Sequence, residues 1–195
     1  MSENMHVICL QETGHILGAL SAATSNAPPD LEAIVGSQLS ISNVRSSEIP
    51  TDKLLPARTH IPASLLELKS VPLDPAVISN PTNHAVDGGR VVKLPPLTAV
   101  PITPTLEYQA ITLENGTIDA LAFTVVARTG DPTDQLRIQS GTFVDQDGDG
   151  SVDKLILPLS ILPGETPAAI EDSGSYDIFV ALQGVRPYWA MQPLP

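Results

Sequence analysis

Cysteine is almost absent from the sequence, since Cys9 is the only one among 195 residues. A single thiol cannot form an internal disulfide, so the class of small disulfide-stabilised domains is excluded. Cys9 lies in the apolar run Val7-Ile8-Cys9-Leu10, which is typical of a strand. A cysteine in such a run packs like a small apolar side chain. We therefore predict a buried, unreactive thiol.

Basic residues are also scarce. Lys and Arg number 10 against 22 Asp and Glu, so the formal net charge is −12 at pH 7. We expect no nucleic-acid partner, because the basic surface that binds nucleic acid is missing. An anionic membrane surface would repel the chain as well. The acidity is compatible with calcium or with a basic protein partner.

The sequence has no long apolar run. No segment approaches the roughly 18 apolar residues of a membrane span. The first six residues, MSENMH, do not begin the basic and then apolar pattern of a signal peptide. We therefore expect no membrane insertion, no signal peptide, and a cytoplasmic or particle-associated location.

Catalytic motifs that spacing alone can reveal are missing too. The sequence contains no phosphate-binding loop, no H-E-x-x-H helix, no G-x-S-x-G elbow and no dinucleotide-binding glycines. A carboxylate pair could still meet in the folded chain. However, aromatic residues make up only 4% of the chain, and His, Lys and Arg are few. We expect that the protein is not an enzyme.

Proline, by contrast, is abundant, with 19 residues. This is about twice the average usage of roughly 5%. Prolines break helices and interrupt central strands. The sequence therefore predicts a mainly β fold of short strands joined by turns and extended segments. Its length allows one domain or two small ones.

The N-terminal region, 1–70, is expected to contain a β-hairpin with arms at 5–10 and 15–20. His6 and His15 lie on the two arms and could approach each other. One interpretation is a metal or proton site. The other is that both are polar residues on the solvent-exposed face of the hairpin.

A short helix is expected further along this region. Asp30 is a suitable N-cap for a helix over 31–35, which Gly36 would end. A strand pattern follows over 38–44.

Residues 71–105 are the main change in composition, because seven prolines occur within them. Only residues 90–94 have the pattern of a strand, so the remainder is expected to be extended or polyproline-like. This stretch could be a linker between the two ends of the chain, or an arm that lies along another subunit.

The C-terminal region, 106–195, contains five or six strand patterns, which are typical of a small antiparallel β-sandwich. Two of these patterns, 106–113 and 118–128, flank Asn115-Gly116. Asn-Gly between two such runs is a strong hairpin signal. The sequence therefore predicts that these two strands pair with each other.

The aspartate-rich stretch 145–153 is the one place where spacing points to a specific chemistry. Calcium takes about 6–8 oxygen ligands, which an EF-hand loop supplies from alternate positions. Gly150 occupies the position where such a loop turns sharply. The expected calcium ligands are the carboxylates of Asp145, Asp147, Asp149 and Asp153 and the carbonyl of Ser151.

This loop departs from the EF-hand, because Ile156 replaces the closing glutamate and the flanks 141–144 and 155–159 have strand patterns. The pattern D-x-D-G-D-G-x-x-D between strands resembles the calcium loops of integrin-type propeller repeats. It is also similar to those of dockerin and thrombospondin type 3 modules. The resemblance covers about a dozen residues and occurs once, so it implies a calcium loop but no repeat architecture. The alternative is a metal-free polar hairpin turn.

The C-terminal tail gathers large apolar residues of the kinds that protein interfaces bury. These candidate partner-binding residues are Tyr188, Trp189, Met191 and Leu194. Either Trp189 packs beneath the sandwich, or the tail docks on a partner.

Together these features predict a non-catalytic structural or interaction subunit of a larger assembly, stabilised by one calcium ion, with other protein subunits as partners. The proline-rich middle would gain order by lying on another subunit, for example in a phage-tail-like or contractile-injection particle. The alternative is a free calcium-dependent adhesion or carbohydrate-binding module. Such modules usually present exposed aromatics beside the metal, whereas only Phe143 lies near this loop.

Overall fold

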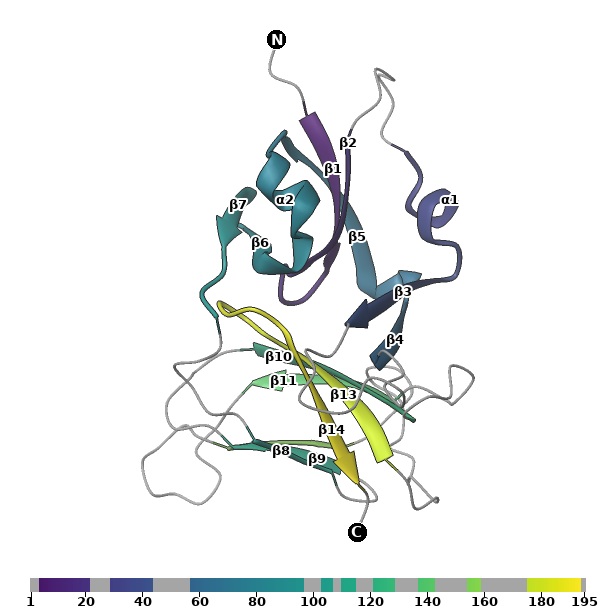
Figure 1. Ribbon diagram of the computed structural model, residues 1–195, viewed down its shortest axis with the longest axis vertical. Coiled ribbons are helices and arrows are strands. Elements are labelled where there is room, and N and C mark those ends of the chain that lie inside the picture. The colour runs from purple at the N-terminus through teal and green to yellow at the C-terminus, as the bar shows by residue number, and fades with distance from the viewer. Residues whose placement is uncertain are drawn as a thin grey trace, which may run out of the picture.

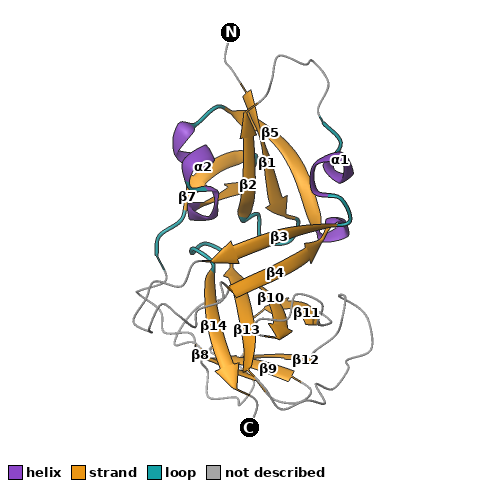
Figure 2. Ribbon diagram, turned by 45° about the vertical axis from the view of Figure 1, so that its right-hand side comes forward, coloured by secondary structure: helices purple, strands orange, loops and turns teal. Residues whose placement is uncertain are grey.

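The computed structural model describes most of the N-terminal half and the strands of the C-terminal half (Figures 1 and 2). The described residues are 4–21, 29–43, 57–96, 103–106, 110–114, 121–128, 137–142, 154–158 and 175–193. Strands dominate this structure, and every strand pairing is antiparallel. The prediction of a mainly β fold is therefore confirmed. None of the described helices is long and apolar enough to cross a membrane.

The N-terminal sheet has the order β2-β1-β5. Its strands are β1 (Asn4–Leu10), β2 (Ile16–Ser21) and β5 (Leu66–Pro72). The predicted hairpin is confirmed, because β1 and β2 pair from Met5 with Ser21 to Cys9 with Ile16. Its turn needs a glycine at position 14, where φ is 71° and an added Cβ would lie 2.4 Å from the Val86 carbonyl oxygen.

The central strand β1 is covered on both faces, which explains its nearly continuous apolar sequence. Met5, Val7 and Cys9 belong to one buried cluster, together with residues of α2 and β6. Ile8 and Leu10 point to the opposite face and belong to a second cluster.

Two helical turns and a hairpin cover the first face of this sheet. They are α2 (Pro75–Ser79), the 3₁₀ helix η2 (Pro81–Asn83), β6 (His84–Asp87) and β7 (Arg90–Lys93). The prediction that this stretch is extended is therefore wrong at 75–79 and 81–83, which are helical, and β6 is a strand that was not predicted. Pro75 and Pro81 begin their helices, where the missing N–H costs nothing, and the Asp74 side chain accepts the Ala76 N–H at 2.8 Å. These prolines start elements instead of interrupting them.

The predicted helix is present as α1 (Leu31–Val35), with Asp30 as its N-cap and Gly36 after it at φ 67°. The strand β3 (Gln38–Asn43) follows and pairs with β4 (Ala57–Pro62), which the 3₁₀ helix η1 (Ala63–Leu65) connects to β5. Figure 2 shows the β3–β4 pair between the N-terminal sheet and the C-terminal strands, and β4 contacts both β10 and β13.

The C-terminal region contains two antiparallel sheets, of the orders β11-β10-β13-β14 and β12-β9-β8. The first comprises β10 (Leu121–Arg128), β11 (Arg137–Thr142), β13 (Ser175–Leu182) and β14 (Tyr188–Pro193). The second comprises β8 (Thr103–Leu106), β9 (Ala110–Glu114) and β12 (Lys154–Pro158). At the two sides of the pair, β11 contacts β12 and β14 contacts β8.

The hairpin predicted around Asn115-Gly116 is wrong, because β9 and β10 belong to different sheets. β9 pairs with β8 and β12, whereas β10 pairs with β11 and β13. Residues 115–120 lie outside the described part of the chain. A turn signal between two strands thus did not determine which strands pair.

The N-terminal and C-terminal halves of the chain share one hydrophobic core. Its buried members are Ile8, Leu10, Leu17, Ile41, Ile61 and Leu66 from the N-terminal half and Phe123, Val125, Phe179 and Ala181 from the C-terminal half. Figure 1 shows the corresponding arrangement, with β10 and β13 directly below the N-terminal elements. The division of the chain into domains at 1–70, 71–105 and 106–195 stays a prediction.

Candidate functional site

The predicted calcium ligands lie in residues 143–153, outside the described part of the chain. The strands on either side are described, because β11 ends at Thr142 and β12 begins at Lys154. These two strands belong to different sheets, so the alternative of a hairpin turn between them is wrong. The chain passes instead from β11 in one sheet to β12 in the other, and these two strands contact each other.

Elsewhere in the described residues, no group of three or more His, Cys, Asp or Glu side chains is placed to hold a metal ion. The aspartate loop stays a candidate metal site, and calcium binding there stays a prediction. A cation bound there would lie in the segment between the end of β11 and the start of β12.

His15 is fully buried, so the interpretation of a solvent-exposed residue is wrong for it. Its Nε2 lies 2.7 Å from the carbonyl oxygen of Val185, and its Nδ1 lies 2.8 Å from Oγ1 of Thr13. Because a carbonyl only accepts, Nε2 carries the proton and Nδ1 accepts from the Thr13 hydroxyl in the neutral ring. Burial lowers the pKa of His15, which favours this neutral form, although the Val185 carbonyl acts in the opposite direction.

The turn between β13 and β14 is held by the N-terminal half through further hydrogen bonds. The backbone N–H of Arg186 donates to the carbonyl of Pro95 at 3.0 Å, and its Nε donates to the carbonyl of Leu94 at 3.0 Å. Together with the bond from His15 to Val185, these contacts hold the turn that precedes β14 against the N-terminal half.

The backbone of the predicted partner-binding tail forms an edge strand. Tyr188, Trp189 and Met191 lie in β14, which pairs with β13 from Val180 with Tyr188 to Ser175 with Pro193. Leu194 lies outside the described residues. Among the described strands, β14 is hydrogen-bonded on one side only. Binding of a partner by this tail stays a prediction.

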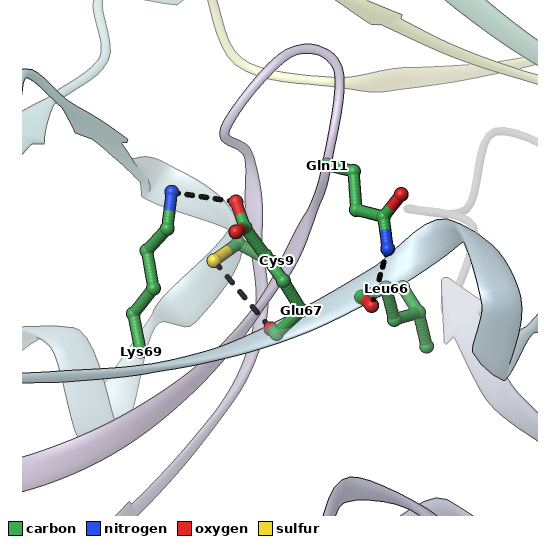
Figure 3. A network of polar contacts seen from close by, with 5 residues as sticks. All are labelled: Cys9, Gln11, Leu66, Glu67 and Lys69. Atoms are coloured by element: carbon green, nitrogen blue, oxygen red, sulfur yellow. Dashed lines mark hydrogen bonds and ion pairs between the residues drawn. The ribbon is translucent and has the colours of Figure 1, made fainter.

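The prediction of a buried thiol is confirmed at Cys9 (Figure 3). Its Sγ lies 3.7 Å from the carbonyl oxygen of Glu67, whose carboxylate pairs with Lys69. Burial, and secondly the charge of Glu67, raises the pKa of the thiol to about 12, although Lys69 opposes this. Nearby, the side chain of Gln11 donates to the carbonyl of Leu66 at 2.9 Å, which ties the hairpin turn to β5. The thiol is therefore part of the core and is not a nucleophile at neutral pH.

A polar cleft of about 330 Å³ opens between α2, η2 and the β6–β7 hairpin. Its polar lining residues are Asp74, Asn80, Asn83, His84 and Lys93. Sequence reasoning does not predict a site here, because His84 has no ligand-like neighbours in the chain and 71–105 is expected to be extended. The available signal was Asp74-Pro75, an N-cap followed by proline at the first helical position.

No family model, no curated protein and no solved structure matches this chain. Three features of the chain bear on its function: the edge strand β14, the aspartate loop between β11 and β12, and the polar cleft beside α2.

Proposed function

We propose that this chain is a non-catalytic structural or interaction subunit of a larger protein assembly, bound to its partner through the outer edge of β14. The observation that carries the proposal is the position of β14 at the edge of the four-stranded sheet with the uncharged sequence YWAMQP. An edge strand presents unpaired N–H and C=O groups that can pair with another chain. Aromatic and Met side chains are enriched in protein interfaces.

The other edge strands of the three larger sheets carry features that discourage such pairing. Charged residues and prolines are common protections of an edge. In this chain, the protecting residues are Glu67 and Lys69 in β5, Arg137 in β11, Lys154 in β12 and Pro104 in β8. The uncharged strand β2 is contacted by α2 and η2. In β14, a proline occurs only at the last position, Pro193, so residues 188–192 keep their N–H groups.

We also propose that one calcium ion stabilises this subunit through the loop 145–153. The supporting observation is that the loop connects β11 of one sheet to β12 of the other. Four carboxylates within nine residues repel one another unless a cation neutralises them. A bound ion would join the two sheets at the side opposite β14, which would leave the partner-binding edge open.

Two matched variants test the role of β14. Gln192→Lys puts a charge on β14, and Gln139→Lys puts the same charge on β11, the opposite edge of the same sheet. The tagged chain would be produced in its native cells and its mass measured by size-exclusion chromatography with light scattering. We expect the wild type and Gln139→Lys in a high-mass complex and Gln192→Lys as free protein.

Two outcomes would contradict the proposal. One is a wild-type chain that is monomeric in its native extract, above all if it turns over a substrate. The other is equal behaviour of the two lysine variants, which would show that the edge of β14 is not the contact.

A further inference from the structure

The cleft beside α2 contains a histidine whose remaining hydrogen-bonding atom has no protein partner. His84 is only 6% exposed, and its Nδ1 lies 3.0 Å from the carbonyl oxygen of Asn80. Since that oxygen can only accept, Nδ1 donates, and the neutral ring has its lone pair on Nε2. No described residue forms a hydrogen bond with Nε2, and His84 lines the cleft. A buried ring in this tautomer offers an acceptor to a ligand.

The other strand of the hairpin, β7, supplies a positive charge beside His84. Lys93 pairs directly with His84, so both side chains are on one face of the hairpin. The turn fixes this register, because Gly88 and Gly89 both have positive φ, at 54° and 78°, as a tight hairpin turn requires. Lys93 is exposed, and no described residue forms an ion pair with it.

The remaining polar groups can both donate and accept. The amide groups of Asn80 and Asn83 each offer donors and an acceptor. Asp74 uses one carboxylate oxygen, Oδ1, to cap α2, which leaves the other as an acceptor. A fully deprotonated anion would attract Lys93 but face unsatisfied acceptors on His84 and Asp74. An anion with a hydroxyl of its own satisfies both kinds of group.

We propose that this cleft binds a small oxyanion that carries its own hydroxyl group, as monohydrogen phosphate and 2-hydroxy carboxylates do. The anionic oxygens accept from Lys93 and the asparagine amides, and the hydroxyl donates to Nε2 of His84. The volume of about 330 Å³ is at the lower end of the range of ligand pockets, which restricts the ligand to a small molecule. This site is separate from the edge of β14 and does not depend on partner binding.

Pairs of ligands that differ in the hydroxyl test this selectivity. The full chain would be titrated calorimetrically at pH 8 in calcium-free, low-salt buffer with phosphate, sulfate, glycolate and acetate. Phosphate keeps one proton at this pH and can donate it, whereas sulfate has none. We expect phosphate to bind about three- to tenfold more tightly than sulfate, or glycolate to bind that much more tightly than acetate. The reason is that the ligand without the hydroxyl cannot form the hydrogen bond with Nε2 of His84. A preference within the first pair would identify the ligand as a phosphate, and a preference within the second pair would identify it as a 2-hydroxy carboxylate.

Two variants of the same strand test the contact with the anion. Lys93→Gln removes the charge in the cleft and should weaken binding about tenfold or more, as expected for a lost charge-assisted hydrogen bond. Arg90→Gln removes a charge from the exposed start of β7, outside the cleft, and should change binding about twofold or less. Neither site is buried, so both variants should fold.

Nitrogen NMR of the histidine rings reports directly on the tautomer of His84 and on whether its Nε2 accepts a hydrogen bond. The His84 ring should be the Nδ1–H tautomer, and its Nε2 resonance should shift when the preferred ligand is added. The proposal is overturned if neither hydroxyl-bearing ligand is preferred, or if Lys93→Gln and Arg90→Gln bind alike. An Nε2 resonance that does not respond to the ligand would overturn it as well.

Discussion

Acidification should weaken the fold through His15, the buried residue that links the hairpin turn to the turn before β14. The pKa of His15 in the folded protein is lowered from its ordinary value of 6.5, because burial disfavours the charged ring. The unfolded chain therefore binds the proton first as the pH falls. Stability is complete above pH 6.5, decreases as the pH falls below that value, and becomes constant again below the folded pKa.

The pH dependence of the free energy of unfolding is that of the single proton that His15 binds. Between the two pKa values, each pH unit lowers the free energy of unfolding by about 1.4 kcal/mol. No charged group contributes to the shift, whose causes are burial and the Val185 carbonyl. Protonation leaves the bond from Nε2 to Val185 in place, so the loss comes from burying the charge.

His15→Gln is the informative substitution, because a glutamine amide can still donate to Val185 but does not titrate. Free energies of unfolding would be measured by urea titration at pH 7.5, 6.5 and 5.5 for both proteins. We expect the wild type to lose more stability than His15→Gln between pH 6.5 and 5.5, by up to about 1 kcal/mol. All other titratable groups are the same in the two proteins and cancel in the comparison. Equal pH dependence of the two proteins would refute the reasoning.

Three further predictions concern the thiol, the hairpin turn and the metal loop. Cys9 should react with a thiol reagent slowly until the protein is denatured, and rapid labelling of the native protein would contradict its burial. Gly14→Ala should cost about 2 kcal/mol or more in urea titration, because the new Cβ would strike the Val86 carbonyl. Gly88→Ala, at a positive φ but in open space, should cost about 1 kcal/mol, and equal losses would contradict the contact. Calcium at a hundredfold excess over Kd should add about 2.7 kcal/mol of stability, seen as a higher Tm than in chelator. Asp149→Asn should reduce this gain, and an unchanged Tm without heat on titration would exclude the site.

Elements defined by neighbouring residues were predictable from the sequence. The N-terminal hairpin has alternating apolar arms and a polar turn, and the structure pairs β1 with β2. The helix α1 has its cap at Asp30 and its glycine at 36, as the sequence indicated. These signals act over a few residues, so no distant contact can reverse them easily.

Strand pairing depended on distant residues, and there the sequence misled. Asn115-Gly116 favours a hairpin, but β10 is placed between β11 and β13, where Phe123 and Val125 reach the shared core. Burial of these side chains outweighs a local turn preference, which amounts to about 1 kcal/mol or less. The apolar pattern of a strand does not show which distant segment will pack against it.

The burial of His15 and the place of His84 in a cleft were missed for a similar reason. His15 lies beside a polar turn, which indicated exposure, but its acceptor is Val185, 170 positions away in the chain. His84 became part of a cleft only because α2 and η2 fold back over the sheet. In both cases the decisive partner is a backbone carbonyl, and every residue type supplies one, so the sequence carries no signal for it.

Because of the shared core, we expect that the C-terminal sheets do not fold as an independent unit. Removing residues 1–96, which keeps β8 intact, would expose the face of β10 and β13 that carries Phe123, Val125 and Phe179, all 1% exposed or less. Each such side chain contributes about 1.5–3 kcal/mol when fully buried, so the loss approaches the 5–15 kcal/mol that stabilises a typical protein. The turn at Val185 and Arg186 would also lose its hydrogen bonds to His15, Leu94 and Pro95. We therefore expect the fragment 97–195 to lack a cooperative thermal transition in circular dichroism, with or without calcium. A fragment that melts cooperatively near the Tm of the whole chain would show instead that the sandwich is a separate domain.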